Sequence, residues 1–134
     1  MDNQFITDKR EVPGRWVAIM DYSRNDRNLE LTPYKSRCMK KGEVHEFLVC
    51  DSKTDISKSI NNVSYIGFGE ITESGVIEPG DNLIIDGEII GEIIGFDESH
   101  MPNHYNIIIR CKNLNTGKEI GLQPFGAFEI SSNK

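Results

Sequence analysis

The sequence has few of the residues that build disulfide frameworks or zinc sites. Its 134 residues include three cysteines, and no two of them form a C-x-x-C pair. An odd number of cysteines without that spacing is unsuited to a disulfide framework and to a structural zinc site. We therefore expect Cys38, Cys50 and Cys111 to be reduced and buried thiols.

Long hydrophobic runs and an excess of positive charge are also absent. No apolar run approaches the ~20 residues of a membrane-spanning helix, and the longest candidate, residues 83–96, is interrupted by carboxylates. The 15 basic residues are outnumbered by 21 acidic ones, which leaves a net charge of −6 and disfavours nucleic acid as the main partner. The N-terminal segment lacks the apolar core of a signal peptide. We expect a cytoplasmic protein without membrane insertion.

Short β-strand patterns separated by turns dominate the rest of the chain. Segments rich in β-branched, aromatic and other apolar residues occupy positions 15–22, 43–50, 63–68 and 104–112. The pair Asp86-Gly87, flanked by isoleucines, is the strongest hairpin signal. By contrast, residues 23–30 are polar and typical of turns. This spacing predicts an all-β fold, a small antiparallel β-barrel or barrel-like sandwich.

One short helix is expected over residues 53–61. Thr54 or Asp55 would cap it, and Ile56 and Ile60 would lie on the face that docks against the sheet. Upstream of the first strand, residues 1–13 are polar and end at a Pro-Gly pair, which predicts a loose N-terminal arm. Residues 14–134 would then form a single β-barrel domain.

From about residue 60 to residue 113, the order of these features resembles the glucitol/sorbitol-specific IIA component of the bacterial phosphotransferase system. A short helix is followed by the strand "YIGFG", then "GVIEPGD", "LIIDG" and a strand ending "IIIRC". The resemblance implies a small cytoplasmic β-barrel. In that family the strand equivalent to "YIGFG" carries a phosphoaccepting histidine and a second histidine two residues later. Those positions are Gly67 and Gly69 here, and glycine offers no nucleophile.

The loop "FDESHMPNH" gathers the polar side chains that could do chemistry. Its carboxylates and imidazoles, Asp97, Glu98, His100 and His104, could bind a divalent metal or form an acid–base pair. The alternative is an exposed polar loop whose histidines merely titrate. H-x-x-x-H spacing imposes no geometry on a loop, so we assign no metal ligand and no catalytic residue.

If a ligand pocket exists, we expect it where the "YIGFGE" strand passes this loop. The two glycines would leave space, and nearby side chains would orient the ligand, with an arginine pairing an anion. The residues of this predicted site are Gly67, Gly69, Glu70, His100, His104 and Arg110. The alternative is that the glycines serve backbone geometry, with a packed neighbour filling the space, and that both histidines face solvent.

Three functions remain open from the sequence. The favoured one is a non-catalytic binding or regulatory module on a IIA-like barrel that has lost its phosphotransfer histidine, without a cofactor and with an unknown small-molecule or protein partner. The second is a small enzyme or metal-dependent protein built on the loop that starts at Asp97. The third is a homo-oligomeric assembly protein without a small-molecule site.

Overall fold

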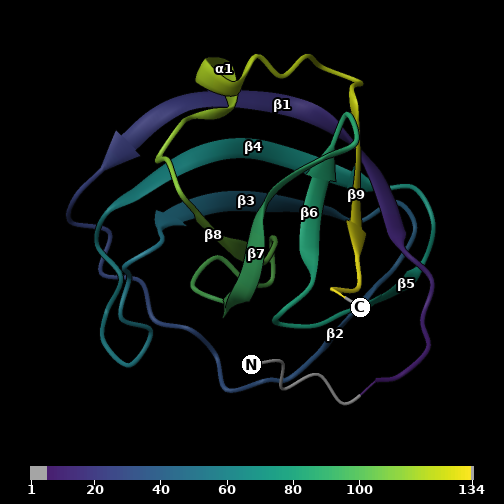
Figure 1. Cartoon of the computed structure of the whole chain (residues 1–134), viewed down its shortest axis with the longest axis horizontal. Coiled ribbons are helices and arrows are strands. Elements are labelled where there is room, and N and C mark those ends of the chain that lie inside the picture. Colours follow the sequence, from purple (N-terminus) through teal and green to yellow (C-terminus); the bar gives the residue numbers. More distant parts are fainter. Residues whose placement is uncertain (1–5, 134) are drawn as a thin grey trace.

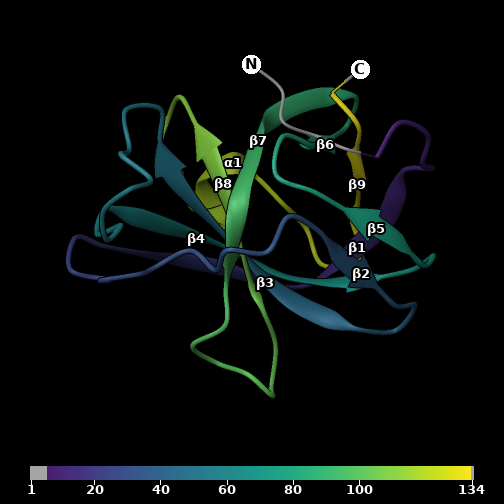
Figure 2. The ribbon, with the colours of Figure 1, turned by 90° about the horizontal axis from the view of Figure 1, so that it is seen from below.

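Strand sequences that are apolar on one or both faces close into a β-barrel in the computed structural model (Figures 1 and 2). The structure describes residues 6–133. The strands are β1 (Val12–Arg24), β2 (Arg37–Met39), β3 (Val44–Asp51), β4 (Val63–Ile71), β5 (Gly75–Ile77), β6 (Asn82–Ile85), β7 (Glu88–Asp97), β8 (Asn106–Cys111) and β9 (Ala127–Ser131). One short helix, α1 (Gly117–Ile120), lies beside β1.

The barrel strands follow the order β1-β4-β3-β8-β7-β6-β9, and β9 pairs with β1 to close the ring. The predicted small β-barrel with one short helix is therefore confirmed. One part of the prediction needs correction, because β3 and β8 pair in parallel while the other barrel pairings are antiparallel. Parallel neighbours need a long crossover and are usually buried on both faces. Both conditions hold, since four strands lie between β3 and β8 in the chain and both strands are almost wholly buried.

Apolar side chains form two layers, one inside the barrel and one on its outer surface. Inside, the rings of Trp16 and Phe128 lie 4.5 Å apart between centroids, and Phe47 packs edge-on against both. The outer layer lies on the outer face of β3, β4 and β8. Its residues are Leu29, Leu48, Cys50, Ile60, Val63, Tyr65 and Ile108. Two of its members come from connecting segments, so those segments are part of the packed structure.

The β6–β7 hairpin has the predicted turn. Asp86 and Gly87 both have positive φ, at 55° and 78°. Positive φ at both central residues defines a type I′ turn, whose twist matches that of the flanking strands. The hairpin signal at this pair is therefore confirmed.

The expected helix over residues 53–61 is wrong, because this segment forms turns. The Asp51 carboxylate accepts a hydrogen bond from the Lys53 backbone N–H at 2.9 Å, and the Asp55 carboxylate accepts one from the Ser57 N–H at 3.0 Å. Such local side-chain bonds compete with helical ones. Ile60 is nevertheless buried as expected, whereas Ile56, expected on the same docking face, is exposed.

The helix lies instead at α1, where a capping box holds its first turn. The Thr116 hydroxyl accepts from the Glu119 N–H at 3.1 Å, and a Glu119 carboxylate oxygen accepts from the Thr116 N–H at 2.9 Å. Gly121, with φ of 93°, ends the helix. Within residues 6–133 no helix is long and apolar enough to cross a membrane.

The predicted N-terminal arm is only partly visible, because residues 1–5 lie outside the described residues. Farther along, the Lys9 ammonium lies 2.9 Å from a Glu78 carboxylate oxygen and 2.6 Å from an Asp81 carboxylate oxygen. Val12 already pairs with Ile130 of β9. The described part of the arm is thus held against the barrel, and the boundary expected at residue 14 falls inside β1.

Candidate functional site

The "YIGFGE" strand and the "DESHMPNH" loop do lie together. The rings of Phe68 in β4 and His104 in the loop meet edge to face at 5.2 Å. His104 is buried, and its Nε2 lies 3.2 Å from a carboxylate oxygen of Glu46 in β3. His100 is exposed and stacks on His104 at 5.2 Å. The loop therefore docks on the outer face of β3 and β4 through His104.

The space expected beside Gly67 and Gly69 is filled. A Cβ at Gly67 would overlap the backbone carbonyl of Ala18 in β1, and a Cβ at Gly69 would lie 2.6 Å from the Phe128 ring. Gly67 also adjoins an irregularity in the pairing of β4 with β3. Phe47 pairs with Gly67, but the next residue, Leu48, pairs with Tyr65. The two glycines are thus explained by close backbone approach and ring packing, and no side chain could replace them without moving a neighbour.

The other predicted site residues are engaged at separate places. Glu70 accepts a hydrogen bond from Arg15 Nε at 3.0 Å. Arg110 donates to the Thr54 carbonyl at 3.3 Å and lies near the end of β8 opposite to His104. The structure therefore brings His100 and His104 together but separates Arg110 from them, and the ligand-binding assignment of these residues stays a prediction.

The carboxylates of the loop hold the loop itself. Asp97 accepts hydrogen bonds from the Ser99 N–H at 2.9 Å and from the Asn106 side-chain amide at 3.1 Å. Glu98 forms an ion pair with Arg37. Among residues 6–133 no three His, Cys, Asp or Glu side chains form a group that could hold a metal ion.

A histidine outside the predicted site, His45, lies near the same end of the barrel. Its Nδ1 accepts from the Tyr105 N–H at 3.0 Å, so the ring proton of the neutral imidazole is on Nε2, which faces Glu43 at 3.3 Å. Burial lowers the pKa of His45, and this effect outweighs the hydrogen bond and charge of Glu43, which act in the opposite direction. This imidazole is therefore a neutral, fully hydrogen-bonded part of the structure.

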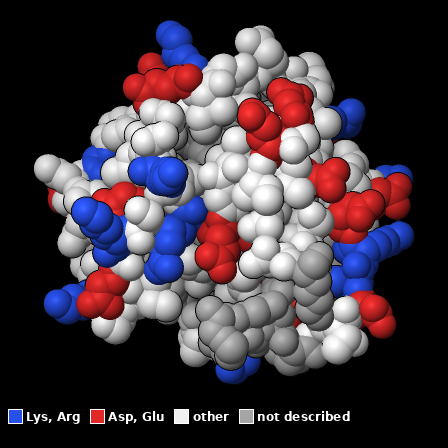
Figure 3. Space-filling model, in the orientation of Figure 1, with Lys and Arg blue, Asp and Glu red and all other residues white. Residues whose placement is uncertain are grey.

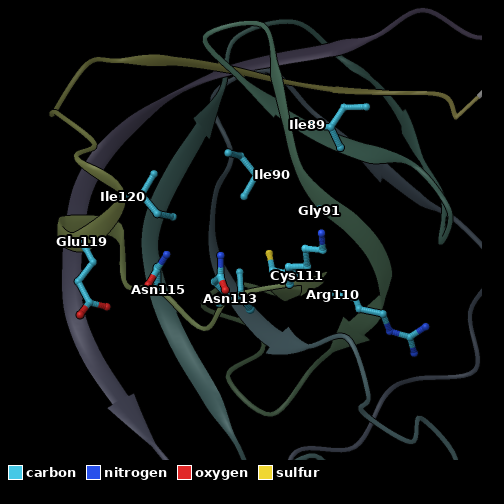
Figure 4. A pocket seen from close by; sticks show the side chains of 11 residues that line it. Ile89, Ile90, Gly91, Arg110, Cys111, Asn113, Asn115, Glu119 and Ile120 are labelled. Atoms are coloured by element: carbon cyan, nitrogen blue, oxygen red, sulfur yellow. The ribbon is translucent and has the colours of Figure 1, made fainter.

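A pocket lies at the other end of β7 and β8, in a place that the sequence did not indicate. Residues 92–97 of β7 pair with β8, whereas residues 88–91 pair with β6 alone. The two strands therefore diverge beyond Gly91, where a Cβ would overlap the Arg110 carbonyl and lie 2.8 Å from Cys111 Sγ. The divergence leaves a hollow of about 580 Å³ between the β6–β7 hairpin and the segment that leads to α1 (Figure 4). We call it the barrel-mouth pocket.

The barrel-mouth pocket has an apolar floor and a polar rim. Its floor is built from Val49, Ile90, Gly91, Cys111 and Ile120, and its exposed rim from Ile89, Lys112, Asn113, Asn115 and Glu119. In the view of Figure 4, Asn113 and Asn115 are drawn below Ile90 and Ile120, while the side chains of Glu119 and Arg110 point outward on opposite sides. The lining is thus mixed rather than mainly apolar, and it offers a ligand both aliphatic contacts and polar groups.

The thiol in the pocket floor is not a nucleophile near neutral pH. Burial raises the pKa of Cys111 to about 12. The thiolate is the reactive form of cysteine, and it is scarce at such a pKa. The pocket is therefore suited to binding rather than to covalent chemistry at this residue.

No local pattern in the sequence identifies this pocket. The segment "KNLNTGKE" looks like a turn, and its asparagines become pocket residues only because β7 leaves β8 at Gly91. A usable signal was present for the neighbouring helix, since Thr116 and Glu119 have the T-x-x-E spacing of a capping box.

Comparisons with known proteins identify a family but no activity. Neither the curated proteins nor the solved structures contain a match to the chain. Nothing in these comparisons links it to the IIA component of the phosphotransferase system. A model of a family of unknown function, DUF6917, matches residues 6–131. The chain therefore belongs to the DUF6917 family.

Proposed function

We propose that this protein is a non-catalytic binding module of the cytoplasm, and that its small-molecule ligand occupies the barrel-mouth pocket. The observation that carries the proposal is the combination of an aliphatic floor with two exposed carboxamides, those of Asn113 and Asn115. Neither carboxamide is hydrogen-bonded to another described residue, so both are available to a ligand. Carboxamides supply donors and acceptors that fix the orientation of a bound molecule.

The state of the ionisable groups supports binding over group transfer. The Cys111 thiol is held in its protonated form, and the imidazoles of His45 and His104 are hydrogen-bonded to carboxylates of the protein. At the positions of the IIA phosphohistidines, Gly67 and Gly69 carry no acceptor and pack against neighbours. The IIA-like origin of the barrel stays a prediction, and phosphotransfer is not part of the proposed function.

The distribution of surface charge also supports a small ligand. Over the face shown in Figure 3, Lys and Arg side chains lie beside Asp or Glu rather than in one large patch. Strong steering of a charged macromolecule requires a field of one sign. The face shown in Figure 3 has no such field.

Filling the pocket tests the proposal. A mixture of small metabolites is screened against the wild-type protein by saturation-transfer NMR, and hits are repeated on Asn115→Trp. The indole should occupy the hollow and abolish binding of the hits, while the exposed position of Asn115 leaves the barrel intact. The matched control is Asn62→Trp, at an exposed asparagine outside the pocket.

Two results would count against the proposal. One is a set of hits that bind Asn115→Trp as well as the wild-type protein, which would place their site elsewhere. The other is the absence of any hit for a folded wild-type protein, with folding checked by its thermal unfolding transition.

A further inference from the structure

The charges around the barrel-mouth pocket favour an anionic ligand. Lys112 is exposed at the rim, and no carboxylate among residues 6–133 is in ion-pairing distance of it. Glu119 accepts the Thr116 N–H in the capping box, and its side chain points outward in Figure 4. Arg110, the other cation that lines the pocket, points outward and donates to the Thr54 carbonyl, so Lys112 supplies the positive charge of the rim itself. One ammonium neutralises one negative charge, so the rim matches a monoanion more closely than a dianion.

The carboxamides supply the remaining donors for an acidic head group. Asn113 and Asn115 are two residues apart in the chain, and both line the pocket. Each carries an NH₂ group, and neither is hydrogen-bonded within the described part of the chain. Donors from two amides and one ammonium match the two oxygens of a carboxylate, each of which accepts about two hydrogen bonds.

The floor of the barrel-mouth pocket favours an aliphatic group for the part of the ligand beyond its acidic head group. The side chains of Val49, Ile90 and Ile120 are branched and aliphatic, and the Cys111 thiol is uncharged. No aromatic side chain is among the residues that line the pocket, so a nucleobase or another flat ring would have no stacking partner. An alkyl chain gains free energy from such a surface by burial alone.

We infer that the barrel-mouth pocket binds a small aliphatic carboxylate, with its alkyl chain on the isoleucine floor and its head group between Lys112 and the two asparagines. This inference rests on the proposed function and narrows it to one class of ligand. The bound acid is held as its anion and undergoes no reaction.

A series of ligands with one chain and three head groups tests this assignment. Butyrate, hexanoate and octanoate are titrated into the full-length protein by calorimetry, together with the amide and the alcohol of each. We expect the acid to bind at least fivefold more tightly than its amide or alcohol, because only the acid gains the charge of Lys112. Each pair of methylenes that reaches the floor should tighten the Kd about tenfold.

Two matched pairs of variants locate the head group. Lys112→Gln should weaken octanoate about fivefold and leave octanol unchanged, whereas Lys118→Gln, on α1 outside the pocket, should change neither. Asn113→Asp places a carboxylate beside the head group and should weaken octanoate at least tenfold. Asn62→Asp makes the same change of net charge away from the pocket and should have no effect. All four positions are exposed, so these variants should fold.

The outcomes separate this inference from the proposed function. The carboxylate assignment would be overturned, while the binding function stands, if amides or alcohols bound as tightly as the acids and lost that binding in Asn115→Trp. Acid binding that Lys112→Gln leaves unchanged would also overturn it. If no member of the series binds while metabolites from the screen do, the assignment fails alone. If neither binds, both fail.

Discussion

The three cysteines differ in how much water reaches their thiols, and their reactivity should follow. Cys38 is exposed, whereas Cys50 and Cys111 are buried. Burial raises the pKa of Cys50, and that of Cys111 rises to about 12. A raised pKa keeps a thiol protonated until the pH approaches the raised value, so about one Cys111 in ten thousand is a thiolate at pH 8.

We therefore predict one fast-reacting thiol in the folded protein. With a chromogenic disulfide reagent at pH 8, Cys38 should react quickly, and the two buried thiols should react only as the protein opens. In denaturant all three should react quickly, and Cys38→Ser should remove the fast phase from the folded protein. Fast reaction of two thiols in the native state would contradict the burial of Cys50 or Cys111.

Single residues also show where sequence reasoning ends. The contact between Glu46 and His104 joins positions 58 apart in the chain. No local sequence pattern around either residue indicates that the two are in contact. The local properties of Gly67 and Gly69 allowed both a notch and close packing. The choice depended on Phe128 and Ala18, which come from β9 and β1. The sequence showed which backbone conformations these glycines allow, but it did not show which residues of other strands pack against them.

At the scale of elements, the sequence predicted strands better than helices. Turn chemistry at Asp86-Gly87 led directly to a hairpin, and the apolar composition of residues 43–50 led to a strand. The helix was misplaced because Asp55, one of the two expected caps, instead accepts hydrogen bonds from the Ser57 N–H and hydroxyl in a turn. The capping box at Thr116 sits before only four helical residues, too few for an apolar period to be visible.

The capping box gives a prediction for α1. Thr116→Ala should destabilise the protein by about 0.5–2 kcal/mol, because the Glu119 N–H loses its acceptor. The Thr116 hydroxyl also donates to Asp21 in β1 at 2.9 Å, so the link between helix and barrel is lost as well. Urea unfolding measures the change, and Thr116→Ser, which keeps the hydroxyl, is the control. An alanine variant as stable as the wild-type protein would mean that the box contributes nothing to the fold.

At the scale of the whole molecule, the class of the fold was predictable, but the order and pairing of its strands were not. Period-two patterns indicate which segments become strands, but they do not say which strands become neighbours. The parallel pairing of β3 with β8 is consistent with the closure of the ring, because seven strands cannot all be antiparallel to both neighbours. The barrel-mouth pocket depends on where β7 leaves β8, which is a matter of strand pairing, so it had no local signature.

The outer apolar layer shows the same dependence on the whole chain. Residues 23–30 look like a polar turn, yet Leu29 is fully buried against the outer surface of the barrel. Its N–H donates to the Ile60 carbonyl at 2.9 Å, and the Asn28 N–H donates to the Asn61 side chain at 2.9 Å. The β1–β2 and β3–β4 connections thus bond to each other over β3, β4 and β8, and we call this contact the outer clasp. Leu29 fills the space between the outer clasp and the sheet.

Leu29→Ala should therefore destabilise the protein by about 2–5 kcal/mol, the usual result of removing a large aliphatic side chain from a packed interior. Ile56→Ala is the matched control, since Ile56 lies in one of the same two connections but is 51% exposed, and its removal should cost well under 1 kcal/mol. Urea unfolding followed by Trp16 fluorescence gives both values. Because Trp16 lies inside the barrel, loss of the outer clasp should shift its transition. An unchanged Trp16 transition in Leu29→Ala would show that the outer layer unfolds independently of the barrel.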